Sequence, residues 1–250
     1  MYIDLHCHLD MLENIPNACE NAKGAGVKKI VTTGICPESN RKALELSSKY
    51  DIVEASLGVY PWDALEFEKN QKLDFNIEDE IEFIKHSKER IVAIGEVGLD
   101  YKNGKADNGQ RKQFRKMIEL AIELDKPIII HSRKAEADAI EILEEYKMEK
   151  VVMHCFSGKK RLLRRARDNG WYFTVPTSAV RAEQHKMIIH EVNLSRLFCE
   201  TDSPFLSPHR EYWNEPAFVV ESYKKIAEIK GLELNEVKNN VFLNWQRIFS

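Results

Sequence analysis

The chain contains no apolar run that approaches the roughly 20 residues a transmembrane helix needs. It also has no basic N-terminal segment followed by an apolar stretch, the pattern of a secretory signal. Its five cysteines are odd in number and unclustered, which argues against a disulfide framework and against a Cys-x-x-Cys zinc site. These absences predict a cytoplasmic protein that does not enter a membrane and keeps its thiols reduced.

Strong charge imbalance is absent as well. The formal net charge is -3 and the pI is about 6.3, so the whole chain exerts no general attraction on nucleic acid. Residues 159–167 are a local exception, since they carry several lysines and arginines and no acid. A solvent-exposed helix face is the usual fate of such a run, and a phosphate-binding face is the alternative. No linker, repeat or composition shift interrupts residues 1–250, which predicts a single domain.

Short apolar runs rich in β-branched residues alternate with segments of helical periodicity. In residues 110–124, for example, Phe114, Met117, Ile118, Ala121 and Ile122 form one stripe. The predicted strands are Tyr2–Leu5, Lys29–Thr33, Ile52–Leu57, Ile91–Ile94, Pro127–Ile130, Val151–Met153, Trp171–Val175 and Leu197–Cys199. The predicted helices are Pro16–Ala25, Glu38–Lys49, Ile77–Lys88, Gln110–Leu124, Ala135–Tyr146, Lys159–Asn169 and Ala182–His190, with Ala217–Lys230 and Leu234–Phe249 as closing helices. This alternation predicts an α/β fold, a (β/α)₈ TIM barrel, with an open doubly wound sheet as the competitor.

Metal-binding side chains fall at the ends of five of these strands. Two histidines one residue apart follow the first strand, and in extended backbone both would point to the same side. The carboxyl ends of all strands of a barrel open onto one face, where the active sites of such enzymes lie. The residues predicted to meet there are His6, His8, Glu96, His131, His154 and Asp202.

Six nitrogen and oxygen ligands exceed the needs of one catalytic zinc, which takes about three protein ligands. Two divalent ions roughly 3.5–4 Å apart share such a set readily when one carboxylate bridges them, and together they lower the pKa of a shared water. Glu96, central in chain order, is the predicted bridge. Imidazoles suit zinc and carboxylates admit magnesium or manganese, so the set leaves Zn, Mg and Mn open. The predicted reaction is metal-assisted hydrolysis.

Five ordered motifs resemble the TatD family of metal-dependent deoxyribonucleases, within the amidohydrolase superfamily, over essentially the whole chain. They are Asp4-x-His6-x-His8-x-Asp10, Gly95-Glu96-Val97-Gly98-Leu99-Asp100, His131-Ser132-Arg133, His154-Cys155-Phe156-Ser157-Gly158 and Glu200-Thr201-Asp202-Ser203-Pro204. The resemblance implies a TIM barrel with two metal ions that hydrolyses DNA from a 3′ end. It also implies that His6, His8 and Asp202 hold one ion, that His131 and His154 hold the other, and that Glu96 holds both.

The chain departs from the family pattern at two places. Many members carry Gly-x-His-Pro after the third strand, whereas this chain has Gly58-Val59-Tyr60-Pro61. Members often have arginine just before Asn-x-Pro, whereas Trp213 precedes Asn214 here. Tyr60 can donate a hydrogen bond or stack on a base, but its phenol does not titrate near neutral pH. The departures bear on the substrate more than on the metals.

Further roles follow for individual side chains. Asp202 is predicted to take the proton of the attacking water, with Glu96 as its catalytic partner. Arg133 lies two residues beyond His131 and is a predicted phosphate clamp, with an ion pair to Asp138 or a neighbouring acid as the alternative. Ser157 is predicted to bind a phosphate where the basic helix begins, or simply to cap that helix.

The other polar and aromatic residues receive supporting roles. Asp4, Asp10 and Asp100 are predicted to orient or cap rather than to bind metal. Four histidines away from the strand ends are predicted to lie on the surface: His86, His185, His190 and His209. Core-edge packing is the default role for four loop aromatics, and base stacking is the alternative: Tyr60, Trp62, Tyr212 and Trp213.

Two other functional classes remain open. The same two-metal barrel supports hydrolysis of amides, esters or lactones, and an enzyme that removes D-amino acids from tRNA would need similar ligands. A non-catalytic barrel that binds nucleic acid or protein around a structural metal is the third class. The favoured partner is DNA, as single strands or 3′ ends, and no stable protein partner is implied.

Overall fold

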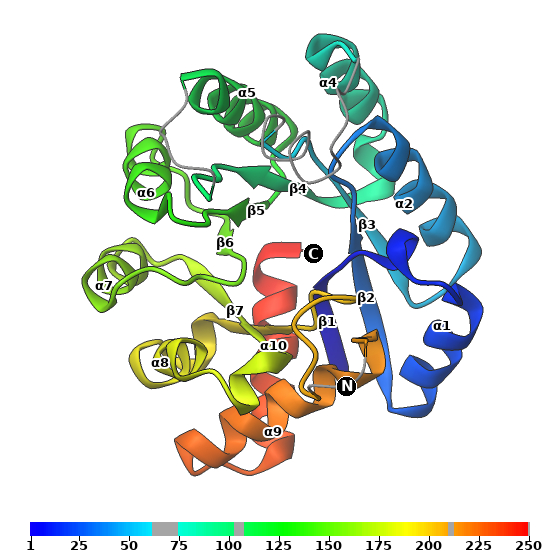
Figure 1. The fold of residues 1–250 in the computed structure, drawn as a ribbon, viewed down its shortest axis with the longest axis vertical. Coiled ribbons are helices and arrows are strands. Elements are labelled where there is room, and N and C mark those ends of the chain that lie inside the picture. Colours follow the sequence, from blue (N-terminus) through cyan, green and yellow to red (C-terminus); the bar gives the residue numbers. More distant parts are fainter. Residues whose placement is uncertain (62–74, 103–107, 210–212, 250) are drawn as a thin grey trace.

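The computed structural model describes residues 1–61, 75–102, 108–209 and 213–249. Eight parallel strands form one sheet in which spatial order follows chain order (Figure 1). The strands are β1 (Tyr2–Cys7), β2 (Val27–Thr33), β3 (Val53–Leu57), β4 (Ile91–Gly98), β5 (Ile128–His131), β6 (Val151–Met153), β7 (Tyr172–Pro176) and β8 (Leu197–Glu200). Each predicted strand is present, most of them shifted or extended by a residue or two.

The two end strands meet and nearly close the sheet into a barrel. The backbone N–H of Asp202 donates to the carbonyl of His6 at 2.9 Å, and the N–H of His8 donates to the carbonyl of Ser203 at 2.8 Å. These bonds join the chain after β8 to the end of β1. The predicted (β/α)₈ barrel is therefore confirmed, and the open doubly wound sheet is wrong.

Helices surround the ring of strands, as the sequence pattern predicts (Figure 1). The α-helices are α1 (Ile15–Gly24), α2 (Pro37–Lys49), α4 (Ile77–His86), α5 (Asn108–Leu124), α6 (Glu136–Glu145), α7 (Lys160–Asp168), α8 (Glu183–Glu191), α9 (Val219–Lys230) and α10 (Leu234–Phe249). Short 3₁₀ turns lie at η1 (Leu9–Met11), η2 (Lys88–Arg90), η3 (Thr177–Val180), η4 (Leu194–Arg196) and η5 (Pro216–Phe218). Gly231, at φ 63°, ends α9 in the left-handed conformation that glycine adopts without strain.

The core lies between the strands and the inward stripe of each helix. On α5 the stripe of Phe114, Met117, Ile118 and Ala121 is fully buried against the barrel. Ile122, predicted to belong to that stripe, is 49% exposed, because it follows Ala121 by one residue and rotates about 100° away from the core. The helix positions were otherwise readable from the 3.6-residue period.

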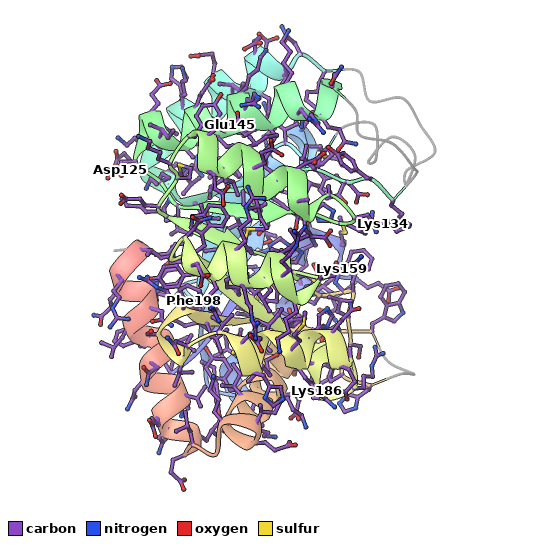
Figure 2. The ribbon with its side chains drawn as sticks, turned by 90° about the vertical axis from the view of Figure 1, so that its left-hand side faces the viewer. Asp125, Lys134, Glu145, Lys159, Lys186 and Phe198 are labelled. Carbon is purple, nitrogen blue, oxygen red and sulfur yellow. The ribbon has the colours of Figure 1, made fainter. Side chains whose placement is uncertain are left out.

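The two ends of the barrel differ in what they present. Helix α10 packs against β1 and β8 at the N-terminal end of the strands, where Asp125 and Glu145 also lie (Figure 2, left). Lys134 and Lys159 lie at the opposite end, at the right of the same view, near the carboxyl ends of β5 and β6. In the described part of the chain, no helix is long and apolar enough to cross a membrane.

The basic segment forms the exposed outer helix α7. Lys160 and Arg164 both pair with Glu191 on α8, at 2.6 and 2.8 Å, and Arg165 pairs with Glu144 on α6. Leu163 is buried on the opposite side. These pairs to flanking helices favour the solvent-exposed face over a phosphate-binding face for most of this charge run.

Candidate active site

The two histidines of the first motif converge where β1 ends. His6 is fully buried within β1, and His8 follows the strand with 5% of its surface exposed. Their ring centroids are 5.0 Å apart in an edge-to-face arrangement. Both Nε2 atoms point to the same carboxylates: to Oε2 of Glu96 at 3.6 Å each, and to Oδ1 of Asp202 at 3.5 and 3.6 Å. The predicted same-side placement is what the structure has.

Glu96 lies in the middle of the cluster, near the end of β4. Its Oε2 faces His6 and His8, while its Oε1 lies 2.8 Å from Nδ1 of His131 and 3.7 Å from Nε2 of His154. Each carboxylate oxygen therefore serves a different pair of imidazoles. This is the arrangement that a bridging ligand requires.

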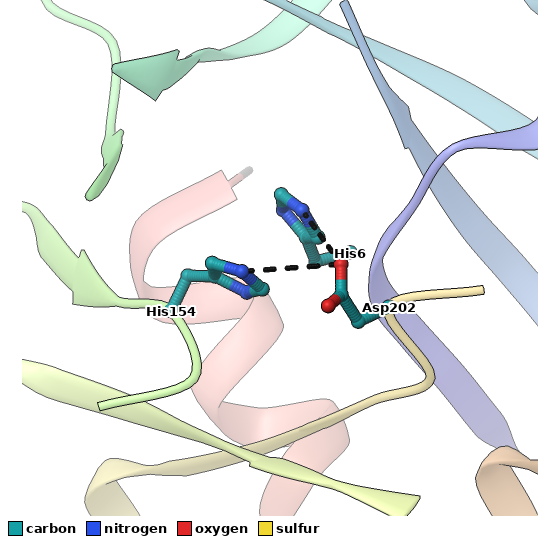
Figure 3. A group of neighbouring side chains, drawn as sticks. All are labelled: His6, His154 and Asp202. Atoms are coloured by element: carbon teal, nitrogen blue, oxygen red, sulfur yellow. Dashed lines mark ion pairs between the residues drawn. The ribbon is translucent and has the colours of Figure 1, made fainter. Parts of the chain in front are cut away.

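Asp202 reaches the cluster from the loop after β8. Figure 3 shows its carboxylate beside the stacked rings of His6 and His154, with Oδ1 at 3.5 and 3.9 Å from their Nε2 atoms. Its backbone is left-handed, at φ 57°, a conformation that aspartate adopts more readily than most residues. The turn brings the carboxylate back over the barrel mouth.

A close approach of two strands sets the position of His131. Gly98 on β4 lies at φ 143°, and a Cβ atom there would stand 2.0 Å from the carbonyl oxygen of His131 on β5. No other residue type fits this contact. The second glycine of the Gly95-Glu96-Val97-Gly98 motif therefore lets β5 present His131 to Glu96.

In His131 and His154, the ring nitrogen that points away from Asp202 or Glu96 is held by a buried carboxylate. Nδ1 of His154 lies 2.7 Å from Oε2 of Glu200, and Nε2 of His131 lies 2.8 Å from Oδ2 of Asp100. Such partners fix the ring and leave the opposite nitrogen free to bind a metal. Asp100 thus has the supporting role that its place in the motif predicts. Sequence reasoning missed Glu200, although its position two residues before Asp202 was a usable signal.

Thr33, at the end of β2, holds the corresponding ring nitrogens of His6 and His8. Its carbonyl oxygen lies 3.2 Å from Nδ1 of His8, and its Oγ1 lies 3.4 Å from Nδ1 of His6. Asp4 lies farther out and accepts hydrogen bonds from the backbone N–H and the hydroxyl of Thr201, at 2.8 and 2.6 Å. Asp4 therefore anchors the loop that carries Asp202.

The cluster has the donor set and the charge that divalent cations need. Three groups of ligand atoms, each within 4.8 Å of one another, are His6–His154–Asp202, His6–His8–Glu96 and Glu96–His131–His154. The Nε2 atom of His6 is buried and has no hydrogen-bond partner within the described residues. A buried nitrogen without a partner is costly unless a ligand binds it. These residues fit metal ions. The groups His6–His8–Glu96 and Glu96–His131–His154 follow the implied division of ligands between two ions, whereas His6–His154–Asp202 crosses it.

Burial and mutual charge shift the pKa values of the cluster. Burial lowers the pKa of His6 to about 4 and raises the pKa of Asp202 to about 6. Burial also disfavours the imidazolium of His154, but Glu200, Asp202 and Glu96 outweigh it and raise its pKa to about 10. The excess of buried negative charge is what raises it. A bound divalent cation would balance that charge and displace the proton.

Tyr60 and Arg133 meet on Asp100, beside His131. The phenol of Tyr60 donates to Oδ2 of Asp100 at 2.9 Å and lies 3.0 Å from Nε2 of His131. Nε of Arg133 donates to the same Oδ2 at 2.6 Å. The acid that Arg133 contacts is Asp100 and not Asp138, which pairs with Arg111. Tyr60, which stands in place of the family histidine, thus contacts the carboxylate that holds His131.

Ser157 is the third residue predicted to bind the substrate. Ser157 is exposed and lies three residues before α7, which begins at Lys160 with Lys159 as its N-cap. The hydroxyl of Ser157 donates to Oε1 of Glu136 at 3.0 Å. The helix-cap alternative is therefore wrong, since the chain passes Ser157 before the helix starts. Its contact with a phosphate stays a prediction.

Five of the six predicted metal ligands and the three predicted substrate residues line one pocket of about 840 Å³, while His6 lies buried beneath it. Its lining includes His8, Glu96, His131, His154 and Asp202, together with Tyr60, Arg133 and Ser157. His185, predicted to lie on the surface, also lines it: this side chain is 3% exposed, and its Nδ1 lies 2.9 Å from Oγ of Ser178. The helical context of His185 concealed this, because the face of α8 that meets the barrel is set by packing.

The predicted loop aromatics divide. Tyr60 lies in the pocket, Trp213 is 77% exposed and does not line it, and Trp62 and Tyr212 fall outside the described residues. Phe205, which sequence reasoning did not single out, does line the pocket.

The comparisons with known proteins agree with this geometry. A family model described as TatD related DNase matches residues 3–250. The chain belongs to this TatD family. It is 34% identical to an uncharacterized metal-dependent hydrolase of Bacillus subtilis, across 100% of this chain and 99% of that protein. It is 32% identical to human deoxyribonuclease TATDN3, across 99% and 94% of the two chains.

The fold comparison gives the same family. A crystal structure of a TatD homologue from Escherichia coli superposes with a TM-score of 0.86 at 25% identity, covering 99% of this chain and 97% of that one. Membership in TatD and the ligand clusters identify the chain as a metal-dependent hydrolase. The predicted family and enzyme class are confirmed.

The role of Glu200 can be tested by removing its charge. We expect Glu200→Gln to lower metal affinity about 10- to 100-fold, because the amide holds Nδ1 of His154 less firmly. Isothermal titration of metal into the chelated protein measures this. Glu80→Gln is the matched control: Glu80 is also buried, but it pairs with Arg41 away from the pocket, so its loss should leave metal affinity unchanged. Equal affinities in all three proteins would contradict the role.

Proposed function

We propose that this TatD protein binds two divalent ions and hydrolyses phosphodiester bonds of single-stranded DNA, releasing nucleotides from the 3′ end. The carrying observation is the position of Glu96, whose two oxygens each face a different pair of histidines. Two ions that share one carboxylate suit a displacement at phosphorus, because they stabilise both the entering and the leaving oxygen. The human relative's name as a deoxyribonuclease supports DNA as the substrate.

The proposed ligands are those predicted from the strand ends. Nε2 of His6, His8 and His154 and Nδ1 of His131 would bind metal, because their other ring nitrogens are held by Thr33, Glu200 and Asp100. The carboxylates of Glu96 and Asp202 complete the set. When bound, the ions would supply Lewis acidity and lower the pKa of a water in the pocket.

Asp202 is the proposed proton acceptor. Burial raises its pKa to about 6, and its carboxylate borders the pocket. A base with a pKa near the working pH combines a useful ionised fraction with a useful driving force. In the proposed reaction the oxygen of a water forms a bond to phosphorus, Asp202 takes the proton, and the bond from phosphorus to the 3′ oxygen of the preceding nucleotide breaks. That oxygen takes up a proton from solvent water and leaves as an alcohol, and Asp202 returns its own proton to solvent.

Arg133 is the proposed phosphate clamp. Its guanidinium lines the pocket and is 35% exposed at the side chain, while Asp100 holds its Nε. Asp100 and Tyr60 thus hold the planar guanidinium in one orientation at the pocket, where its charge and fork geometry suit a phosphate. Tyr60 donates a hydrogen bond to the same carboxylate of Asp100, and it therefore helps to orient both Arg133 and His131. Ser157 lies at the same pocket mouth.

An oligonucleotide assay tests the proposal. Single-stranded DNA labelled at its 3′ or its 5′ end is incubated with chelated protein to which Mg²⁺, Mn²⁺ or Zn²⁺ is added back singly. We expect no hydrolysis after chelation and recovery of activity with at least one metal. A 3′ label should be released at once, whereas the strand that carries a 5′ label should shorten one nucleotide at a time. Metal analysis should give about two ions per chain.

The same preparation is assayed on an acyl ester and on D-aminoacyl-tRNA. A higher kcat/KM for either acyl substrate would replace the nuclease proposal with an acyl hydrolase on the same barrel. Binding of DNA without hydrolysis under every metal would point to the non-catalytic class.

A further inference from the structure

One wall of the pocket is apolar and open to solvent. In the described part of the chain six large apolar side chains are markedly exposed, and two of them, Met11 and Phe205, line this pocket at 38% and 48% exposure. Ile35 and Leu206 extend the same lining. Exposed apolar side chains gathered in a concave site indicate contact with an apolar part of a ligand.

This wall is fixed directly beside the ligand cluster. Met11 ends η1, which follows β1, and Phe205 follows β8. The N–H of Phe205 donates to the carbonyl of Asp202 at 2.8 Å, and its ring lies edge-on to the ring of His8 with centroids 6.2 Å apart. A flat group that stacks on Phe205 would therefore lie close to the substrate atoms beside His8 and Asp202, and both would belong to one monomer of the substrate.

The opposite wall of the pocket is cationic. Lys102 follows β4 and Arg133 follows β5, two strands that pair with each other. In a ring ordered from β1 to β8, the β4–β5 pair lies across the barrel from the meeting of β8 and β1. The pocket thus places an apolar, partly aromatic wall and a cationic wall on opposite sides of Glu96.

We infer that the apolar wall is a nucleobase subsite: the base of the nucleotide being cleaved stacks on Phe205, and its phosphate backbone faces Lys102 and Arg133. This inference rests on the proposed nuclease function and specifies the substrate of that site. Ile35, Met11, Phe205 and Leu206 offer apolar side chains and no side-chain hydrogen-bond donor to a base, so all four bases fit about equally. A base that stacks here has left its partner, which makes the subsite selective for single-stranded ends.

Paired oligomers separate base contact from phosphodiester chemistry. An oligothymidylate and an oligomer of equal length with abasic sites at every position are compared by kcat/KM. We expect the wild-type protein to prefer the thymidylate about 10- to 100-fold, the range that loss of base stacking on an aromatic ring produces. We expect Phe205→Ala to lower kcat/KM for the thymidylate until the preference is nearly lost, and Phe205→Trp to keep it.

Leu243→Ala is the matched control. Leu243 is 46% exposed on α10, at the other end of the barrel, and its removal should leave the preference unchanged. Hydrolysis of both oligomers at equal rates, or an unchanged preference in Phe205→Ala, would overturn the base subsite while leaving the nuclease function intact. Hydrolysis of neither oligomer by the wild-type protein would overturn the nuclease function and the subsite with it.

Discussion

Glu96→Gln is expected to abolish hydrolysis and to remove metal from both histidine pairs that Glu96 faces, His6 with His8 and His131 with His154. The amide keeps the volume of the side chain but loses the charge, and it cannot present two equivalent acceptor oxygens to two cations. Because Oε1 and Oε2 of Glu96 face different histidine pairs, one substitution disturbs both. Loss of about 4 kcal/mol of transition-state stabilisation would lower kcat/KM about 1,000-fold, and loss of both ions would lower it further.

Activity and metal content of Glu96→Gln are measured on the same preparation, by oligonucleotide hydrolysis and elemental analysis. Glu54→Gln is the matched control, since Glu54 is also a strand glutamate, on the neighbouring β3, but it is partly exposed and pairs with Lys29 away from the pocket. We expect Glu54→Gln to keep activity and metal. Loss of only one ion from Glu96→Gln would mean that Glu96 does not bridge.

Strand periodicity explains why the ligand cluster was predictable from the sequence. Residues two apart in a strand share a face, and all strands of a barrel end on the same side, so His6 and Glu96 meet although 90 positions separate them in the chain. The prediction needed only the strand ends to be right within a residue or two. His131 and His154 meet Glu96 for the same reason.

Contacts that depend on loop paths and helix rotation were not predictable in this way. For Arg133 the sequence left open an ion pair to Asp138 or to another neighbouring acid, and the loop after β4 supplies Asp100 as that acid. His185 enters the pocket because α8 packs that face against the barrel. Phe205 lines the pocket through a turn held by Asp202. A sequence pattern fixes the side of a strand, whereas these positions follow from tertiary packing.

The contacts of Tyr60 explain how a chain without the usual family histidine after the third strand keeps the geometry of its predicted metal ligands. Tyr60 occupies that place and shares Oδ2 of Asp100 with His131 and Arg133. The phenol supplies a hydrogen bond but no proton near neutral pH. In the proposed mechanism the proton is therefore assigned to a carboxylate that borders the pocket, and Asp202 is the one whose pKa burial raises to about 6.

Asp202→Asn separates that proton transfer from metal binding. Asparagine also tolerates the left-handed backbone at φ 57°, so the loop should keep its path. We expect kcat to fall about 100- to 10,000-fold, the range for loss of a general base. Metal should be retained better than in Glu96→Gln, because the Glu96–His131–His154 group does not include Asp202.

The pH dependence of the residual activity distinguishes a base from a ligand. Ionised Asp202 accepts the proton, so wild-type kcat should decline as pH falls through the pKa of Asp202, and this acidic limb should vanish in Asp202→Asn. Asp125→Asn is the matched control: Asp125 is also left-handed, at φ 52°, but it lies at the far end of the barrel and pairs with Lys150. An acidic limb that persists in Asp202→Asn would assign the proton to another group. Proportional loss of metal and activity, restored by excess metal, would reduce Asp202 to a ligand.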